Sequence, residues 1–175
     1  MNVSKKSPPK LPESLPFSHP AALIATWFGT GLISKFPGTL ASLATLPCAW
    51  LIMRDFGLNG LLIFVITAFA AGLWASNVMV QEIGDEGADP GMVVIDEVAG
   101  QALTLCVVPP DLMLYFVGFV LFRLFDILKP WPISLCEARI KGGLGIMVDD
   151  IVAGIFAAIC LSIYFFVYQW FISAF

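Results

Sequence analysis

Apolar residues fill most of this chain, and short polar breaks divide them into segments of helical length. The clearest membrane span covers residues 58–80, because about twenty apolar residues cross a bilayer core. Shorter apolar stretches predict further helices at 40–53, 92–108 and 111–124, and a long apolar stretch predicts another at 151–173. The stretch 21–34 contains Gly29-Thr30-Gly31 and favours an interfacial or re-entrant helix. We therefore expect an all-α, multihelical integral membrane protein, an irregular helical array with about three to five membrane-embedded helices.

Two adjacent carboxylates, Asp96 and Glu97, interrupt one of these apolar stretches. Asp89-Pro90 is typical of a helix start and Pro109-Pro110 of a helix end, which predicts one helix from Pro90 to Val108. Ionised groups near hydrocarbon are costly unless they are paired, face water or bind a cation, so a functional site is the first interpretation. The alternative is that the two acids only favour the amino-terminal end of a helix at a membrane surface.

The composition supports a membrane protein. Hydrophobic residues make up 59% of the 175 residues and charged residues 13%, which is too apolar for a soluble globular domain. The net charge of −4 gives no reason to expect nucleic acid as a partner. Residues 1–19 are basic and proline-rich without an apolar signal core, which predicts a disordered cytoplasmic tail before a single membrane-embedded domain at 20–175.

The basic residues predict an orientation in the membrane. If the N-terminus is inside, the expected helices leave only Arg54 of the 9 basic residues outside, in agreement with the positive-inside rule. The same topology brings eight charged side chains to the cytoplasmic face: Lys35, Asp96, Glu97, Arg123, Asp126, Lys129, Asp149 and Asp150.

Several carboxylates at helix starts, next to two or three cations, are the groups that Mg²⁺-assisted phosphoryl chemistry requires. The candidate metal ligands are Asp96, Glu97, Asp126, Asp149 and Asp150, and all but Asp126 are also candidates for a catalytic base. Adjacent helical residues point about 100° apart, so we expect only one of each adjacent pair to bind a given ion. Asp126 has an alternative role, an ion pair with Arg123 or Lys129.

The candidate phosphate-binding residues carry basic or hydroxyl side chains: Lys35, Thr39, Ser42, Arg123 and Lys129. Pro37-Gly38 marks a turn, and Thr39 is the predicted N-cap of a helix that starts at Leu40. Backbone amides at that start would favour a phosphate, although an ordinary turn with a lysine reaching the membrane surface is the alternative. The only histidine, His19, lies in the tail, which argues against a histidine nucleophile or base. Metal-activated water is therefore the expected nucleophile.

Five blocks of sequence, taken together, resemble the phosphatidylglycerophosphatase A family. The blocks are Trp27–Gly31, Lys35–Thr39, Asp89-Pro90 with Val94–Gln101, Phe122–Pro132 and Gly142–Asp150. The resemblance implies a bacterial inner-membrane, Mg²⁺-dependent lipid phosphatase that converts phosphatidylglycerophosphate into phosphatidylglycerol and inorganic phosphate. It also implies an irregular, all-helical phosphatase domain surrounded by bilayer lipids.

Other functions stay open at this point. A membrane CDP-alcohol-type phosphotransferase would also use several aspartates and Mg²⁺, but this chain lacks the D-G-x-x-A-R run of such enzymes. An ion or phosphate carrier would need polar groups at mid-membrane or an internal repeat, whereas the charges here gather at one predicted face. In a purely structural subunit the acids would be dispensable. The oligomeric state is not predicted.

Overall fold

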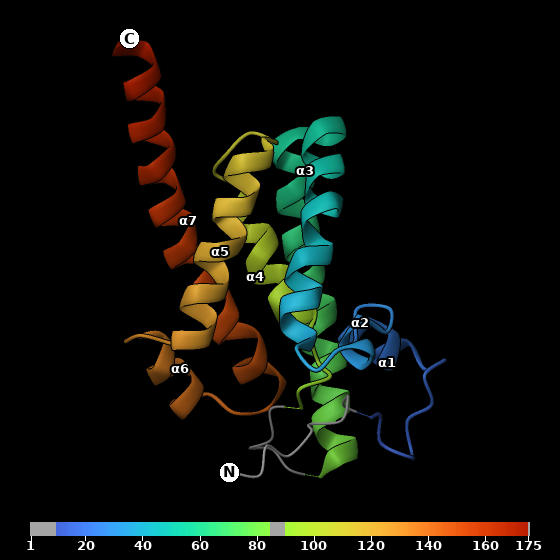
Figure 1. Ribbon diagram of the computed structural model, residues 1–175. Helices are drawn as coiled ribbons and strands as arrows, with labels where there is room; N and C mark the ends of the chain where they lie inside the picture. Colours follow the sequence, from blue (N-terminus) through green and yellow to red (C-terminus); the bar gives the residue numbers. More distant parts are fainter. Residues whose placement is uncertain (1–9, 85–89, 175) are drawn as a thin grey trace.

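The computed structural model describes residues 10–84 and 90–174, and all regular secondary structure in these two ranges is helical (Figure 1). The helices are α1 (Pro20–Ala25), α2 (Thr30–Ile33), α3 (Pro37–Ile83), α4 (Ile95–Leu105), α5 (Leu112–Leu128), α6 (Ile133–Arg139) and α7 (Gly142–Ala174). The expected all-α class is therefore confirmed.

Helix α3 consists of two antiparallel arms. Gly57 has φ 64° and ψ −164°, a non-helical conformation that glycine adopts without the steric cost of a side chain. The chain reverses direction there, so the two arms lie side by side in Figure 1. The arms correspond to the predicted helices at 40–53 and 58–80. The polar break between them carries an exposed ion pair, in which Arg54 Nε lies 2.7 Å from Asp55 Oδ1.

Two predicted helix starts are wrong. Helix α3 begins at Pro37, so Thr39 lies inside the helix and is not its N-cap. Proline suits the first turn because its φ is fixed and its missing N–H has no partner to lose there. Helix α4 begins at Ile95 and not at Pro90, because the backbone before it pairs elsewhere: the Val94 N–H donates to the Ala25 carbonyl at 2.8 Å. Asp89, its predicted cap, lies outside the described residues.

The predicted interfacial helix at 21–34 is divided in two. Trp27, Phe28 and Gly29 all have positive φ values, 46°, 55° and 93°, which ends α1 and starts α2 in a new direction. Before α1, His19 Nδ1 accepts the Ala21 N–H at 3.2 Å and so has a structural role as a cap. Leu15, in the segment expected to be a tail, is buried against the first helices.

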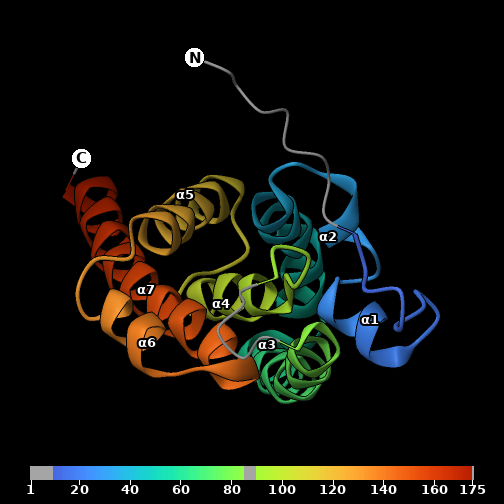
Figure 2. The same cartoon turned by 90° about the horizontal axis from the view of Figure 1, so that it is seen from below.

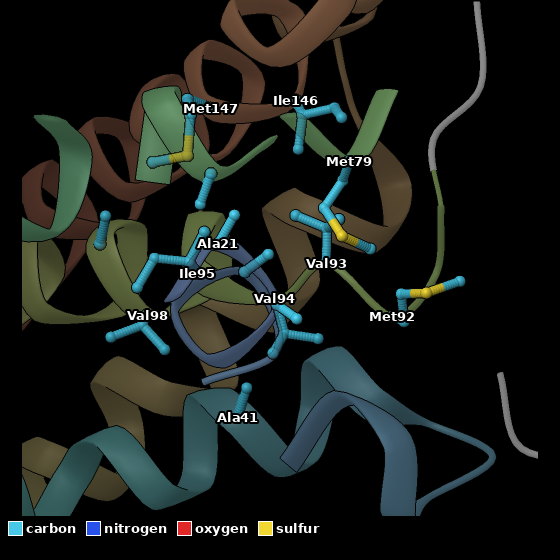
Figure 3. Close-up of a cluster of buried hydrophobic side chains, with 14 of the residues drawn as sticks. Ala21, Ala41, Met79, Met92, Val93, Val94, Ile95, Val98, Ile146 and Met147 are labelled. Carbon is cyan, nitrogen blue, oxygen red and sulfur yellow. The ribbon is translucent and has the colours of Figure 1, made fainter. Parts of the chain in front are cut away.

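Helix α4 forms the centre of the packing. Viewed from below, it lies between α3, α5 and α7 (Figure 2). Its first turn enters a cluster of buried apolar side chains, where Ile95 and Met147 both approach Gly72 of α3 (Figure 3). Burial of these apolar groups stabilises the fold, at roughly 25 cal/mol for each Å² removed from water. The same packing fixes the amino-terminal turn of α4 against α3 and α7.

Two helical stretches, Pro37–Ile83 and Gly142–Ala174, are long and apolar enough to cross a membrane. The end of α7 projects beyond the other helices (Figure 1) and exposes large apolar side chains such as Phe166, Trp170 and Phe171. These features are consistent with a membrane protein. The expected number of about three to five embedded helices stays a prediction.

Candidate active site

A cavity of about 760 Å³ lies where α3, α4 and α7 begin and α5 ends. Nine charged residues line it: Lys35, Asp96, Glu97, Arg123, Asp126, Lys129, Lys141, Asp149 and Asp150. Eight of them are the residues predicted to share one membrane face, and the structure brings these eight into one cavity. The ninth, Lys141, was counted only toward membrane orientation. It could have been found from its position just before the glycines that lead into α7.

Three carboxylates from two helices converge in this cavity. Asp96, Glu97 and Asp150 each offer one oxygen, and these oxygens all lie within 4.8 Å of one another. Asp96 and Glu97 thus reach the same part of the cavity, and the expectation that only one of the two binds a given ion stays a prediction. Asp96 and Glu97 both lie in the first turn of α4, yet Asp96 is only 7% exposed. Asp150, which lies in α7, is 3% exposed. An acid favoured only by a helix end at a surface would be exposed.

The other two acids each form an ion pair with a basic residue of α5 or its C-terminal end. Arg123 pairs with Asp126 three residues later, the alternative role for this acid, and its Nη1 lies 4.0 Å from Glu97 Oε1. Lys129 Nζ lies 2.5 Å from Asp149 Oδ2. Arg123 and Lys129 are thereby held beside the three converging carboxylates, where they balance part of the negative charge.

The start of α3 closes another side of the cavity. A Cβ atom on Gly38 would lie 1.9 Å from Glu97 Oε1 and 3.1 Å from Arg123 Nη1, so only glycine allows this approach. Lys35 and Thr39 line the cavity. Ser42 does not: it is fully buried, and its hydroxyl donates to the Gly38 carbonyl at 2.8 Å. The structure therefore brings together every predicted phosphate-binding residue except Ser42.

The three converging carboxylates fit a divalent cation. Hard oxygen donors are the ligands that Mg²⁺ prefers, and they repel one another when no cation is present. The buried Asp150 Oδ2 has no hydrogen-bond partner among the residues that the structure describes. A donor set of this kind, with basic side chains beside it, is suited to holding a phosphate and activating a water molecule.

The fold and the cavity define a helical protein with apolar outer surfaces and one buried, highly charged site at one end. A family model described as phosphatidylglycerophosphatase A matches residues 23–165, so the chain belongs to this family of phosphatases. No solved structure gives a significant match to this chain.

Three named relatives are similar over most of their length. The Escherichia coli phosphatidylglycerophosphatase A is 37% identical over 157 residues, which cover 89% of this chain and 88% of the relative. The Haemophilus influenzae phosphatidylglycerophosphatase A is 36% identical, with coverages of 81% and 86%. A Bacteroides thetaiotaomicron protein with the provisional name of a phosphatidylinositol-3-phosphatase is 35% identical, with coverages of 88% and 96%.

Proposed function

We propose that this phosphatase hydrolyses phosphatidylglycerophosphate to phosphatidylglycerol and inorganic phosphate, at the cytoplasmic face of a bacterial inner membrane. The observation that carries the proposal is the group formed by Asp96, Glu97 and Asp150. It lies in one cavity with two basic side chains, Arg123 and Lys129, each of which forms an ion pair. Family membership and two relatives named for this lipid favour it as the substrate.

Each group of residues has a distinct role in the proposed reaction. Asp96, Glu97 and Asp150 would hold Mg²⁺, which when bound neutralises negative charge and lowers the pKa of a bound water. Arg123 and Lys129 bind the phosphate oxygens, and Asp126 and Asp149 hold these cations in place.

The reaction is the hydrolysis of a phosphate monoester. A cavity carboxylate accepts a proton as water attacks phosphorus, the bond from phosphorus to the glycerol oxygen breaks, and that oxygen takes up a proton. Lys35 and Thr39 contact the phosphate from the start of α3, where both residues line the cavity. Water, substrate and products balance without any further reactant.

The decisive test is phosphate release from phosphatidylglycerophosphate by the detergent-purified protein. We expect release with Mg²⁺, loss with excess EDTA, and recovery when Mg²⁺ is restored. Asp96→Asn and Asp150→Asn should each lower turnover by about a hundredfold or more, because each removes a charged oxygen from the converging group. Without metal, both variants should unfold at a higher temperature than the unsubstituted protein, because carboxylate repulsion is relieved.

The matched control is Asp55→Asn, which changes an exposed acid at the turn between the arms of α3 and should leave turnover unchanged. Retained turnover in both Asp96→Asn and Asp150→Asn would contradict the proposed site. No release by the unsubstituted, folded protein under any of these conditions would contradict the proposed substrate.

A further inference from the structure

We infer that Phe36 and Ile127 form an apolar rim of the cavity. The glycerol esters and the first acyl carbons of the lipid substrate lie against this rim, while the headgroup occupies the charged interior. This inference rests on the proposed function. Its basis is the position of two exposed apolar side chains among the residues that line a charged cavity.

The two rim residues differ in exposure from other large apolar residues of the cavity lining. Phe36 is 74% exposed and Ile127 is 67% exposed. Val93 and Ile146 also line the cavity, but both are buried in the apolar core. Apolar surface left in water is unfavourable, and contact with an apolar ligand removes it from water. The rim residues are therefore suited to a ligand that brings an apolar part to a charged cavity.

The rim residues come from the ends of two helices that meet closely. A Cβ on Gly38 would lie 3.1 Å from Arg123 Nη1, so the first turn of α3 lies against α5 at this point. Phe36 is the N-cap of α3, two residues before Gly38. Ile127 lies in the last turn of α5, one helical turn after Arg123 and on the same face. The two apolar side chains thus belong to one edge of the cavity.

The charged interior cannot accommodate the apolar part of a lipid. Nine charged residues of the described chain line the cavity, and acyl carbons placed against them would displace water without replacing its hydrogen bonds. The acyl chains must therefore leave the cavity over an apolar surface. Phe36 directly precedes a helix long enough to cross a membrane, so this edge lies near the membrane surface, where the glycerol esters of lipids are found.

The test uses two ligands, of which only one has an apolar part. The first is dihexanoyl phosphatidylglycerophosphate, used below the concentration at which it forms micelles, so that its KM reports binding at the site. The second is inorganic phosphate, a product that competes for the charged interior. Phe36→Gln and Ile127→Gln should each raise the KM for the lipid by about fivefold, because apolar contact is lost. The turnover number should change much less, and the inhibition constant of phosphate should stay the same.

The matched controls change side chains of similar exposure that do not line the cavity. Leu128→Gln alters the next residue of α5, which is also 67% exposed. Ile33→Gln alters a residue of α2 that is 72% exposed. Both controls should leave the KM for the lipid unchanged. Phe36→Leu and Ile127→Leu keep an apolar side chain at the rim, so their KM should stay close to that of the unsubstituted protein.

Three results would overturn the inference. An equal rise of the KM in the rim variants and in the controls would show a general attraction to lipid. A raised inhibition constant of phosphate in the rim variants would place their effect in the charged interior. An unchanged KM in either Phe36→Gln or Ile127→Gln would show that this side chain does not contact the lipid. Absence of phosphate release by the unsubstituted, folded protein would instead reject the proposed function and this inference with it.

Discussion

Gly38 allows charged side chains from two other helices to reach the first turn of α3. Glu97 of α4 and Arg123 of α5 both occupy the space that a side chain at this position would need. Because Glu97 shares the converging group with Asp96 and Asp150, a shift of its carboxylate alters the geometry of all three acids. The geometry of the three acids thus depends on Gly38, a residue that has no side chain.

Gly38→Ala should therefore lower phosphatase turnover by roughly tenfold to a hundredfold, since small displacements of catalytic groups are costly. The added methyl group would lie 1.9 Å from Glu97 Oε1, so the carboxylate must move. Initial-rate measurements at saturating Mg²⁺ would check this. Gly91→Ala is the control, because nothing lies within 4 Å of its added Cβ. Similar turnover in both variants would contradict the argument.

At the level of residues, the sequence predicted which charged side chains gather in the cavity better than how they contact one another. The cost of placing Asp96 and Glu97 near hydrocarbon indicated a functional site before any geometry was known, and the structure places both acids in the cavity. The convergence of Asp96 with Glu97 was missed because helix periodicity describes Cβ directions and not the reach of a longer side chain. Ser42 was placed in the site by its proximity in sequence to Lys35, but its hydroxyl bonds to its own helix.

The crossing of α4 and α7 fixes the distance between the acids of these two helices. A Cβ on Gly154 would lie 2.6 Å from the Gly100 carbonyl oxygen, and a Cβ on Gly100 would lie 2.6 Å from the Asp150 carbonyl oxygen. The two backbones are thus in direct contact. Asp150 lies one turn before Gly154 in α7, so the separation of the helices decides whether Asp150 can meet Asp96.

Gly154→Ala should separate α4 from α7 and destabilise the protein by about 1–3 kcal/mol, a typical cost of overpacking. Thermal unfolding in detergent should show a decrease of several degrees, together with a smaller stabilisation by added Mg²⁺. Ile155→Ala is the control on the same helix, because Ile155 is 45% exposed and contributes less to packing. An unchanged unfolding temperature for Gly154→Ala would show that the crossing tolerates a larger separation.

The sequence predicted which elements exist better than where they begin. The two arms of α3, the short helix α5 and the long helix α7 follow from their apolar runs and polar breaks. The start of α4 could not be found in the same way, because the Val94 N–H bonds to Ala25, which is distant in the sequence. The division between α1 and α2 was missed for a related reason: Trp27 and Phe28 adopt positive φ values that their residue types do not favour.

Across the whole molecule, charge is distributed unevenly between the two ends. The cavity and its charged residues lie at the end where α4 and α7 begin and α5 ends. The turn of α3 lies at the other end (Figure 1), and the exposed pair of Arg54 and Asp55 lies next to this turn in the sequence. The apolar arms of α3 and the helix α7 extend between these ends. This arrangement agrees with the positive-inside rule if the cavity faces the cytoplasm.

If the protein lies in the inner membrane with its cavity toward the cytoplasm, as proposed, Asp55→Cys in a variant whose four native cysteines are replaced should react with a membrane-impermeant maleimide added to intact cells stripped of their outer membrane. Arg139→Cys, at the cavity end, should react only after the inner membrane is permeabilised. The reason is that the two positions lie at opposite ends of helices long enough to cross the bilayer. Protection of Asp55→Cys, with labelling of Arg139→Cys in intact cells, would reverse the orientation.

Helices α3 and α4 both begin at the cavity, and no side chain among the described residues caps either start. The aligned peptide groups of each helix place a partial positive charge at this end. That charge belongs to the backbone, so it neither titrates nor disappears when a side chain is substituted. A protein in which Lys35, Arg123, Lys129 and Lys141 are all replaced by glutamine should therefore keep a weak affinity for inorganic phosphate that does not vary as the pH rises through the range in which lysine loses its proton.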